Sequence, residues 1–244
     1  MKKAMRDASQ FPRFSNNEMN SRHQRVSALI EENNLDAIIF FGFGAFATDI
    51  YWLTDWPGGR ESYVIFQRDS DPVVITQLFN HVPMARVLSV IKDVRWAGAN
   101  TANTVSHFIR DCKLKEQRIG LVGQIPYRHY LLYAESHPEI TFTDVSSPFR
   151  MMRTLKQPEE INRLKKASQL TDKSIKAIAE GLREGMREDQ IPLLIESAYL
   201  EEGGYAGIHF MSSMPMNDPD FPVPAQFHSN RKLQRGDCLI TEIS

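Results

Sequence analysis

Apolar positions in the first part of the chain recur in two patterns, one typical of helices and one typical of strands. Apolar residues three and four apart predict a helix that ends near residue 33, and the apolar run at residues 35–41 predicts a buried strand. Apolar segments at residues 62–66 and 72–76 flank a polar turn and predict a hairpin. Strand-like and helical segments alternate irregularly from there to about residue 145. The pattern therefore predicts an α/β domain built on a mixed sheet.

A different pattern begins after residue 147. The Pro-Glu-Glu run at residues 158–160 is typical of a first helical turn, because proline needs no donor there and the carboxylates lie at the positive end of the helix dipole. Apolar residues then recur at helical spacing, and a second helix ends at the glycine pair at residues 203–204. Strands are predicted at residues 208–213 and 238–244, on either side of a proline-rich stretch.

These patterns divide the chain into three parts. We expect a flexible leader at residues 1–20, which are polar and irregular, then the α/β domain at residues 21–147 and an α+β domain at residues 148–244. Domains usually end at the surface after a completed element, whereas this chain ends inside a predicted strand. We therefore expect the last domain to be truncated.

Composition and charge narrow the class of function. Hydrophobic residues make up 42% of the chain, enough for an ordinary core, and the formal net charge of -1 provides no field that attracts nucleic acid or acidic lipid. No apolar run is long enough to cross a bilayer, and the first residues lack the apolar stretch of a signal peptide. We expect a cytoplasmic protein with a small substrate and with no nucleic-acid or membrane partner. Cys112 and Cys238 are expected to be reduced, and we assign them no chemistry.

Motifs in both parts of the chain resemble one known family. Residues 153–161 (RTLKQPEEI) open the predicted long helix, and residues 233–237 (LQRGD) lead into the closing strand. Nearer the start, Arg25 precedes Leu-Asp-Ala at residues 35–37 and Tyr-Trp-Leu-Thr at residues 51–54. In this order and at this spacing, the motifs resemble the creatinase/prolidase/aminopeptidase P family from about residue 20 onwards.

The resemblance implies a creatinase/prolidase N-terminal-like α/β domain followed by a "pita-bread" catalytic domain made of two related halves. In the metallopeptidase members, an Asp on the strand after the Gly-Asp turn, a second Asp, a later His and two Glu bind two divalent metal ions. Mn, Zn or Co is expected for a full-length member. The later ligands would lie beyond Ser244, so we expect this chain to bind no metal. The resemblance also implies a homodimer.

Glu242 occupies the position of the first metal ligand in this resemblance, where the family has Asp. Glutamate also binds metal through oxygen, but its extra methylene moves the carboxylate by about one bond length, and metal–ligand distances must hold to within ~0.2 Å. The creatine amidinohydrolase branch of the family works without metal. Loss of the Asp therefore does not imply loss of function.

His228 is the candidate catalytic residue. The family has a His upstream of the Gly-Asp turn that contacts substrate, and in the amidinohydrolase branch it acts as acid and base. The spacing of that branch leads to Ala225, whereas the nearest imidazole is His228. A shifted loop would deliver His228 to the active site. The alternative is a surface or packing role, which is commoner for a lone histidine.

Arg60 and His209 are the candidate substrate-binding residues. The Gly-Arg pair that contains Arg60 resembles a segment of the amidinohydrolase branch whose arginine reaches a neighbouring subunit's active site and binds the substrate carboxylate with parallel donors. A solvated turn arginine is the alternative. His209 lies on the predicted strand that borders the active site in a pita-bread fold, with a packing role as the alternative.

The resemblance implies a metal-dependent peptidase of the Xaa-Pro type, of which this chain is an incomplete and inactive part. Two alternatives stay open. One is a non-catalytic pita-bread module that binds a ligand or partner, and the other is a metal-free hydrolase of C–N bonds. The expected substrate is accordingly a small peptide, or a guanidino or amide compound.

Overall fold

The computed structural model describes residues 8–44, 47–111, 118–205, 207–219 and 227–243. The chain forms two compact units, the first unit, Met1–Gln157, and the second unit, Pro158–Ser244. No helix within the described ranges is long and apolar enough to cross a membrane.

Strands and helices alternate in the first unit. Its strands are β1 (Ala37–Phe43), β2 (Glu61–Gln67), β3 (Ser70–Thr76), β4 (Asp93–Trp96), β5 (Arg118–Val122) and β6 (Thr141–Asp144). Its α-helices are α1 (Asn16–Glu32), α2 (Thr48–Thr54), α3 (Val82–Leu88), α4 (Thr101–Asp111), α5 (Tyr127–Ser136) and α6 (Ser146–Met152), with 3-10 turns at Ala8–Gln10 and Phe79–His81.

The described strands of the first unit form one sheet in the order β4-β3-β2-β1-β5-β6. β1 pairs with β2, and β2 with β3, in antiparallel fashion. The other neighbours, β3 with β4, β1 with β5 and β5 with β6, are parallel. The predicted mixed sheet and the β2–β3 hairpin are confirmed.

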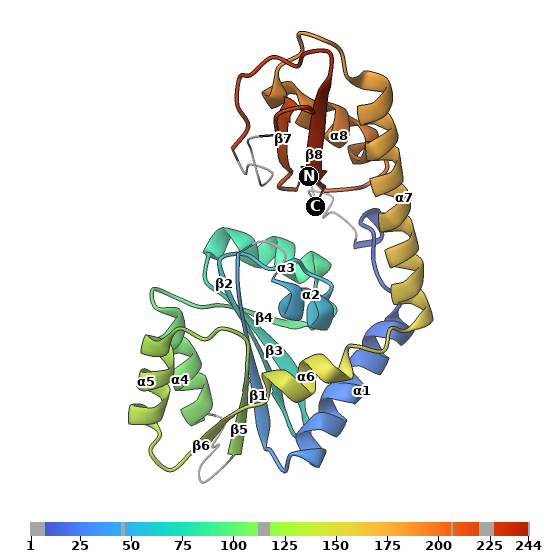
Figure 1. The fold of residues 1–244 in the computed structure, drawn as a ribbon. Helices are drawn as coiled ribbons and strands as arrows, with labels where there is room; N and C mark the ends of the chain where they lie inside the picture. Colours follow the sequence, from blue (N-terminus) through green and yellow to red (C-terminus); the bar gives the residue numbers. More distant parts are fainter. Residues whose placement is uncertain (1–7, 45–46, 112–117, 206, 220–226, 244) are drawn as a thin grey trace, which may run out of the picture. The chain divides into compact units, whose positions relative to one another are not determined.

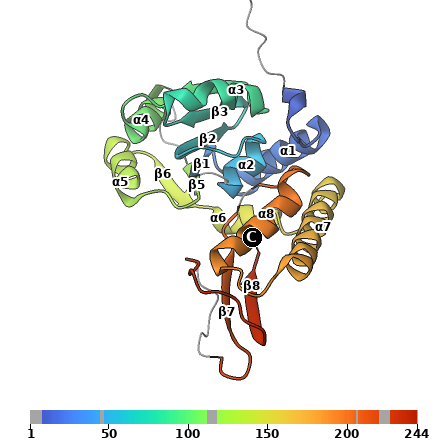
Figure 2. The same cartoon turned by 90° about the horizontal axis from the view of Figure 1, so that it is seen from above.

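Helices cover both faces of this sheet, and the central strand β1 is therefore buried on both sides. Side chains of a strand alternate between faces, so Ile38 and Phe40 join the core beneath α1, α2, α3 and α6, whereas Ile39 and Phe41 join the core beneath α4 and α5. Figures 1 and 2 show α4 and α5 together on one side of the sheet. This two-sided burial explains the uninterrupted apolar run of β1.

The ordered part of the first unit begins earlier than the predicted leader allows. α1 starts at Asn16, because the Ser15 hydroxyl accepts a hydrogen bond from the Glu18 amide at 3.1 Å and so caps the helix. Before it, the Arg13 guanidinium donates to Asp55 at 3.3 Å and to the Leu88 main-chain oxygen at 2.8 Å. Residues 13–20 are thus part of the folded unit, and residues 1–7 lie outside the described ranges.

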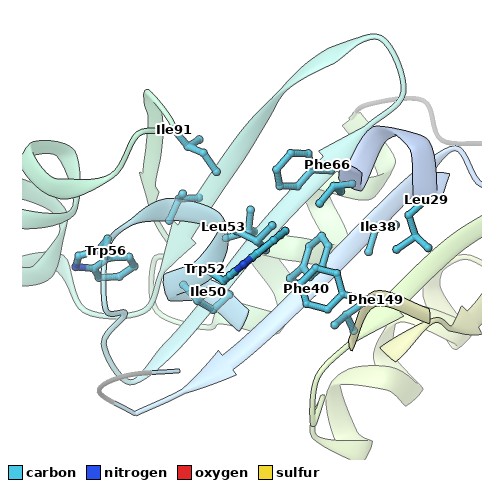
Figure 3. Packing of buried hydrophobic residues seen from close by; sticks show 14 of the residues in the cluster. Leu29, Ile38, Phe40, Ile50, Trp52, Leu53, Trp56, Phe66, Ile91 and Phe149 are labelled. Atoms are coloured by element: carbon cyan, nitrogen blue, oxygen red, sulfur yellow. The ribbon is translucent and has the colours of Figure 1, made fainter. Parts of the chain in front are cut away.

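The first unit also extends past the predicted boundary at residue 147. Phe149 of α6 is fully buried, with its ring 4.9 Å from that of Phe40 and 5.6 Å from that of Trp52 (Figure 3). α6 therefore belongs to the first core, and the compact units divide after Gln157. The ten-residue difference in position arises from tertiary packing that local sequence patterns do not record.

The second unit consists of a helix pair and a strand pair. Its elements are α7 (Pro158–Gly181), a 3-10 turn at Glu188–Gln190, α8 (Ile191–Leu200), β7 (Phe210–Pro215) and β8 (Asp237–Glu242). β7 and β8 are antiparallel, with Phe210 opposite Glu242 and Met214 opposite Cys238. Met211 and Leu239 contact the apolar side chains of α7 and α8, so one face of the strand pair is covered by the helices.

Candidate functional site

One buried carboxylate holds the outer edge of β7. Glu188, in the 3-10 turn before α8, is only 4% exposed. One of its oxygens accepts hydrogen bonds from the Ser213 amide at 2.5 Å and the Ser213 hydroxyl at 2.8 Å. The other accepts from the Ser229 amide at 3.2 Å and from the Ser229 hydroxyl. Glu188 therefore links β7 to the segment at residues 228–233.

The charge of Glu188 is stabilised by these same donors. Burial, the largest single effect, acts to raise the pKa of Glu188, but the hydrogen bonds from Ser229 and Ser213 together lower it below its ordinary value. The carboxylate is consequently ionised at neutral pH. An ionised acceptor forms stronger hydrogen bonds than a neutral one, so the link between β7 and residues 228–233 is firm.

An ion pair fixes the far end of the same segment. The Arg231 guanidinium binds both oxygens of Asp237 at 2.6 and 2.9 Å, and it also donates to the Ser213 hydroxyl at 2.8 Å. The hydrogen bond from Arg231 lowers the pKa of Asp237. Residues 228–233 are thereby attached to β7 and to the first residue of β8.

His228 caps the other end of the β7 edge. Its Nε2 lies 2.7 Å from the His209 main-chain oxygen, and because a carbonyl only accepts, this nitrogen carries the proton and donates. Alternate residues of a strand direct their main-chain groups to the same edge, so the His209 oxygen and the Ser213 amide face the same side. In the neutral imidazole of His228, Nδ1 is then the acceptor.

His209 is a buried, neutral imidazole on the helix side of β7. It is 3% exposed, and a hydrogen bond of 3.2 Å joins its Nε2 to the Tyr199 hydroxyl of α8. Burial lowers the pKa of His209, against an opposing effect of Glu196, whose carboxylate lies 3.8 Å away. Nδ1 of His209 is buried and has no hydrogen-bond partner among the described residues.

Glu242 lies on the opposite face of the strand pair. It is exposed and ends β8 opposite Phe210, whereas the alternate positions Met211 and Leu239 face the helices. Since His209 contacts α8, its side chain and that of Glu242 lie on different faces. The predicted metal-ligating and substrate-binding residues of the second unit are therefore not brought together.

The described residues do not fit a metal ion. Within the ranges that the structure describes, no three His, Cys, Asp or Glu side chains gather as a metal site would require. Two other carboxylates of the second unit already have partners, because Glu188 is bound by serines and Asp237 by Arg231. Glu242 accordingly belongs to no group of three candidate metal ligands in the described part of the chain.

Arg60 lies on an exposed loop of the first unit, directly before β2. Its main-chain oxygen accepts a hydrogen bond from the Gly44 amide at 2.9 Å, and its side chain forms no hydrogen bond with another described residue. The preceding Gly59 lies against His81, where a Cβ atom would come within 2.3 Å of Nδ1. A larger residue at position 59 would thus have to displace the His81 ring. Ala225, the other position considered for the catalytic histidine, lies outside the described residues.

Sequence reasoning missed Glu188 and Tyr199. An acidic residue in a first helical turn is usually solvated, so the sequence gives no reason to single out Glu188. Its burial depends on Ser213 and Ser229, which are far away in the sequence. No local signal in the sequence distinguishes Glu188 from its exposed neighbour Asp189.

Comparison with known proteins assigns both units. Residues 22–155 match the Creatinase/Prolidase N-terminal domain, and residues 162–244 match Metallopeptidase family M24. The Xaa-Pro dipeptidase of Pyrococcus furiosus is 20% identical over 225 residues, covering 92% of this chain and 60% of that protein. The creatinase of a Bacillus species is 23% identical over 244 residues, covering 93% and 57%. The chain thus spans about three fifths of the length of these relatives.

Solved structures show the same fold. The X-Pro aminopeptidase of Thermotoga maritima has a TM-score of 0.72 at 19% identity, over 89% of this chain and 59% of that one. The prolidase of Pyrococcus horikoshii has a TM-score of 0.70 at 19% identity, over 89% and 58%. The predicted α/β domain followed by part of a pita-bread domain is confirmed. This chain therefore belongs to the creatinase/prolidase family, with the family's N-terminal domain and part of a metallopeptidase family M24 domain.

Proposed function

We propose that the protein containing this chain hydrolyses small peptides at the bond that precedes proline. The observation that carries this proposal is the match to Xaa-Pro dipeptidases, which extends over 92% of the chain and includes both units. Because the chain spans about three fifths of those relatives, the activity is proposed for the whole protein.

In this proposal His228 is the proton-transferring residue of the chain. Its Nε2 stays on the His209 oxygen, and its Nδ1 is the atom that accepts a proton from, or returns one to, the reacting group. Arg60, whose side chain forms no hydrogen bond with another described residue, would bind a substrate carboxylate. The proposal gives His209 a supporting role, because its carbonyl orients His228.

Metal ions are the expected cofactors of the M24 family, and they supply a Lewis acid and an activated water when bound. The described residues do not form a site for them. No step of the proposed reaction is therefore assigned to a metal held by Glu242 or by another described side chain.

A second candidate is metal-free hydrolysis of a C–N bond in a guanidino or amide compound. It is favoured by the 23% identity to a creatinase over 93% of the chain and by the fixed tautomer of His228, which leaves Nδ1 as a base. A non-catalytic binding module is the third reading. A homodimer and a cytoplasmic location stay predictions.

The test uses protein purified from the cells that express the native gene, with the 244-residue chain assayed in parallel. Each is incubated with an Xaa-Pro dipeptide or with creatine, with and without a chelator. The proposal expects dipeptide cleavage by the native protein and none by the 244-residue chain. Creatine cleavage that resists the chelator would favour the second candidate. If neither compound is hydrolysed, the result would favour the non-catalytic binding module.

A further inference from the structure

We propose that the first unit contains a binding site for a small organic carboxylate, in the crevice between the carboxyl ends of β1 and β5. This inference does not depend on the proposed function. It rests on three features of the described residues: the topology of the sheet, a cavity at the same place, and the charge of the side chains that line the cavity.

The topology places a crevice between two neighbouring parallel strands. β1 and β5 pair in parallel, from Ala37 opposite Ile119 to Phe40 opposite Val122. After β1 the chain continues into α2, which packs on one face of the sheet, and after β5 it continues into α5, which packs on the other. In open α/β sheets, ligands bind at the carboxyl ends of strands where the connections diverge in this way.

A cavity of about 440 Å³ lies at this point, which is within the size range of small-molecule pockets. Residues from the end of β1, the start of α2, the loop after β5 and α6 line it. The lining includes Phe43, Thr48, Asp49, Gln124, Pro126 and Arg150.

Glycines keep the strand ends that border the cavity free of side chains. At Gly42, a Cβ atom would lie 2.5 Å from Ile50 and 2.6 Å from Ala47. Gly123 has a φ of +100°, and its Cβ would come within 2.3 Å of the Phe41 main-chain oxygen. Main chain alone therefore fits at these two positions, so no side chain projects from them into the cavity.

The charges of the lining favour an anion. The Asp49 carboxylate is already bound by the Arg153 guanidinium, so it does not add an uncompensated negative charge. Arg150 is exposed, and its side chain forms no hydrogen bond with another described residue. Arg150 acts on Asp144, whose pKa is lowered mainly by hydrogen bonds from Ser146 and least by Arg150.

The shape of the lining favours an anion with an apolar body. A guanidinium binds both oxygens of a carboxylate with parallel donors, which Arg150 offers at one side of the cavity. Phe43, which is 62% exposed, and Pro126 provide apolar surface. Thr48 and Gln124 are uncharged hydrogen-bonding side chains. Together these residues suit a small carboxylate attached to a ring or an aliphatic group.

The test is a titration of the isotope-labelled chain with benzoate, followed through the backbone amide signals. We expect saturable shifts at Gly42, Gly123 and Gln124, and about tenfold weaker binding of the neutral analogue benzamide. Arg150→Gln should weaken benzoate binding by about tenfold or more, because a charge-assisted bond is lost. Arg128→Gln, in the exposed part of α5 and outside the cavity, should leave binding unchanged.

A second variant tests the cavity independently, in case Arg150→Gln does not fold. Thr48→Trp adds bulk at an exposed lining position and should abolish the benzoate shifts. The spectra of both variants away from the crevice report whether they are folded. The proposal is overturned if benzoate causes no saturable shift, if benzamide binds equally well, or if either folded variant, Arg150→Gln or Thr48→Trp, binds benzoate as the unchanged chain does.

Discussion

The imidazole of His228 donates a hydrogen bond from Nε2 to the main-chain oxygen of His209, over 2.7 Å. This bond closes one end of the outer edge of β7, and Glu188 closes the other through the Ser213 amide. An open strand edge presents unpaired main-chain groups, so both side chains satisfy groups that a sheet neighbour would otherwise bind. Nε2 of His228 therefore has a structural role, and Nδ1 of the same imidazole is the atom available for proton transfer.

Replacing Glu188 should weaken the second unit. In Glu188→Gln one oxygen becomes an amide nitrogen that faces donors, so we expect a loss of about 2–3 kcal/mol in the free energy that protects the second unit from opening. Hydrogen exchange at the Ser213 amide measures this loss directly. Glu184→Gln, at an exposed turn position, is the matched control, and an equal effect of both substitutions would contradict the assigned role.

Acid should destabilise the second unit through His209. Because burial lowers the pKa of His209 below its ordinary value of 6.5, the unfolded chain binds the proton more readily than the folded chain. The stability contribution is thus complete above pH 6.5 and is lost as the pH falls from there toward the lowered pKa. Hydrogen exchange of β7 amides between about pH 5 and 8 should show this slope. The substitution His209→Phe should remove this pH dependence of stability. The control His107→Gln, at an exposed position of the first unit, should leave it unchanged.

A buried ion pair should be sensitive to removal of one partner. Arg22 and Glu18 are 1% and 8% exposed, with 2.7 Å between Arg22 Nε and the Glu18 oxygen. Arg22→Met leaves the Glu18 carboxylate buried without its partner, and we expect the free energy of unfolding of the first unit to fall by about 3–5 kcal/mol. Tryptophan fluorescence is the readout, because Trp52, Trp56 and Trp96 all lie in the first unit.

Two comparisons make the ion-pair prediction specific. Adding Glu18→Leu to Arg22→Met removes both charges and should recover much of the lost stability. Arg110→Met, at an exposed position in α4, should have an effect of less than about 0.5 kcal/mol. A double variant as unstable as Arg22→Met alone would show that packing, and not the unpaired charge, determines the loss.

Two buried tyrosines should respond unequally to loss of their hydroxyls. Burial raises the pKa of both Tyr63 and Tyr133, so both phenols stay protonated. Tyr133 donates to the Tyr63 hydroxyl at 3.0 Å, and Tyr63 is bonded to Nδ1 of His129 at 2.8 Å. Tyr63→Phe breaks both bonds and should cost about 2 kcal/mol, whereas Tyr133→Phe breaks one and should cost about 1 kcal/mol. Chemical denaturation measures both, and a reversed order would contradict this arrangement.

The sequence predicts the fold correctly where the local pattern of apolar residues matches their burial in the structure. Residues 37–41 are all apolar because β1 is covered by helices on both faces, and such a run predicts a central strand. α7 begins at Pro158, where proline and two acidic residues predict a first turn. These features depend on a few neighbouring residues, which the sequence displays directly.

Features that depend on distant partners were not predictable. Residues 13–20 are mostly polar, and they fold because Ser15 caps α1 and Arg13 reaches Asp55. Glu188 is an ordinary first-turn acid in the sequence and becomes the centre of a network only when Ser213 and Ser229 fold against it. The site candidates came from a family resemblance, and strand alternation then separated His209 from Glu242, which no linear spacing shows.

The measurement that tests the proposed function most directly is the rate of Xaa-Pro dipeptide cleavage by the native-gene protein carrying His228→Gln. Glutamine keeps an amide donor for the His209 oxygen but has no base in place of Nδ1. We expect unchanged protection of the β7 amides and a rate reduced by at least about 100-fold, as for loss of a general acid or base. His107→Gln should retain the full rate. A folded His228→Gln protein with the full rate would contradict the account, because His228 would then serve only as the cap of β7.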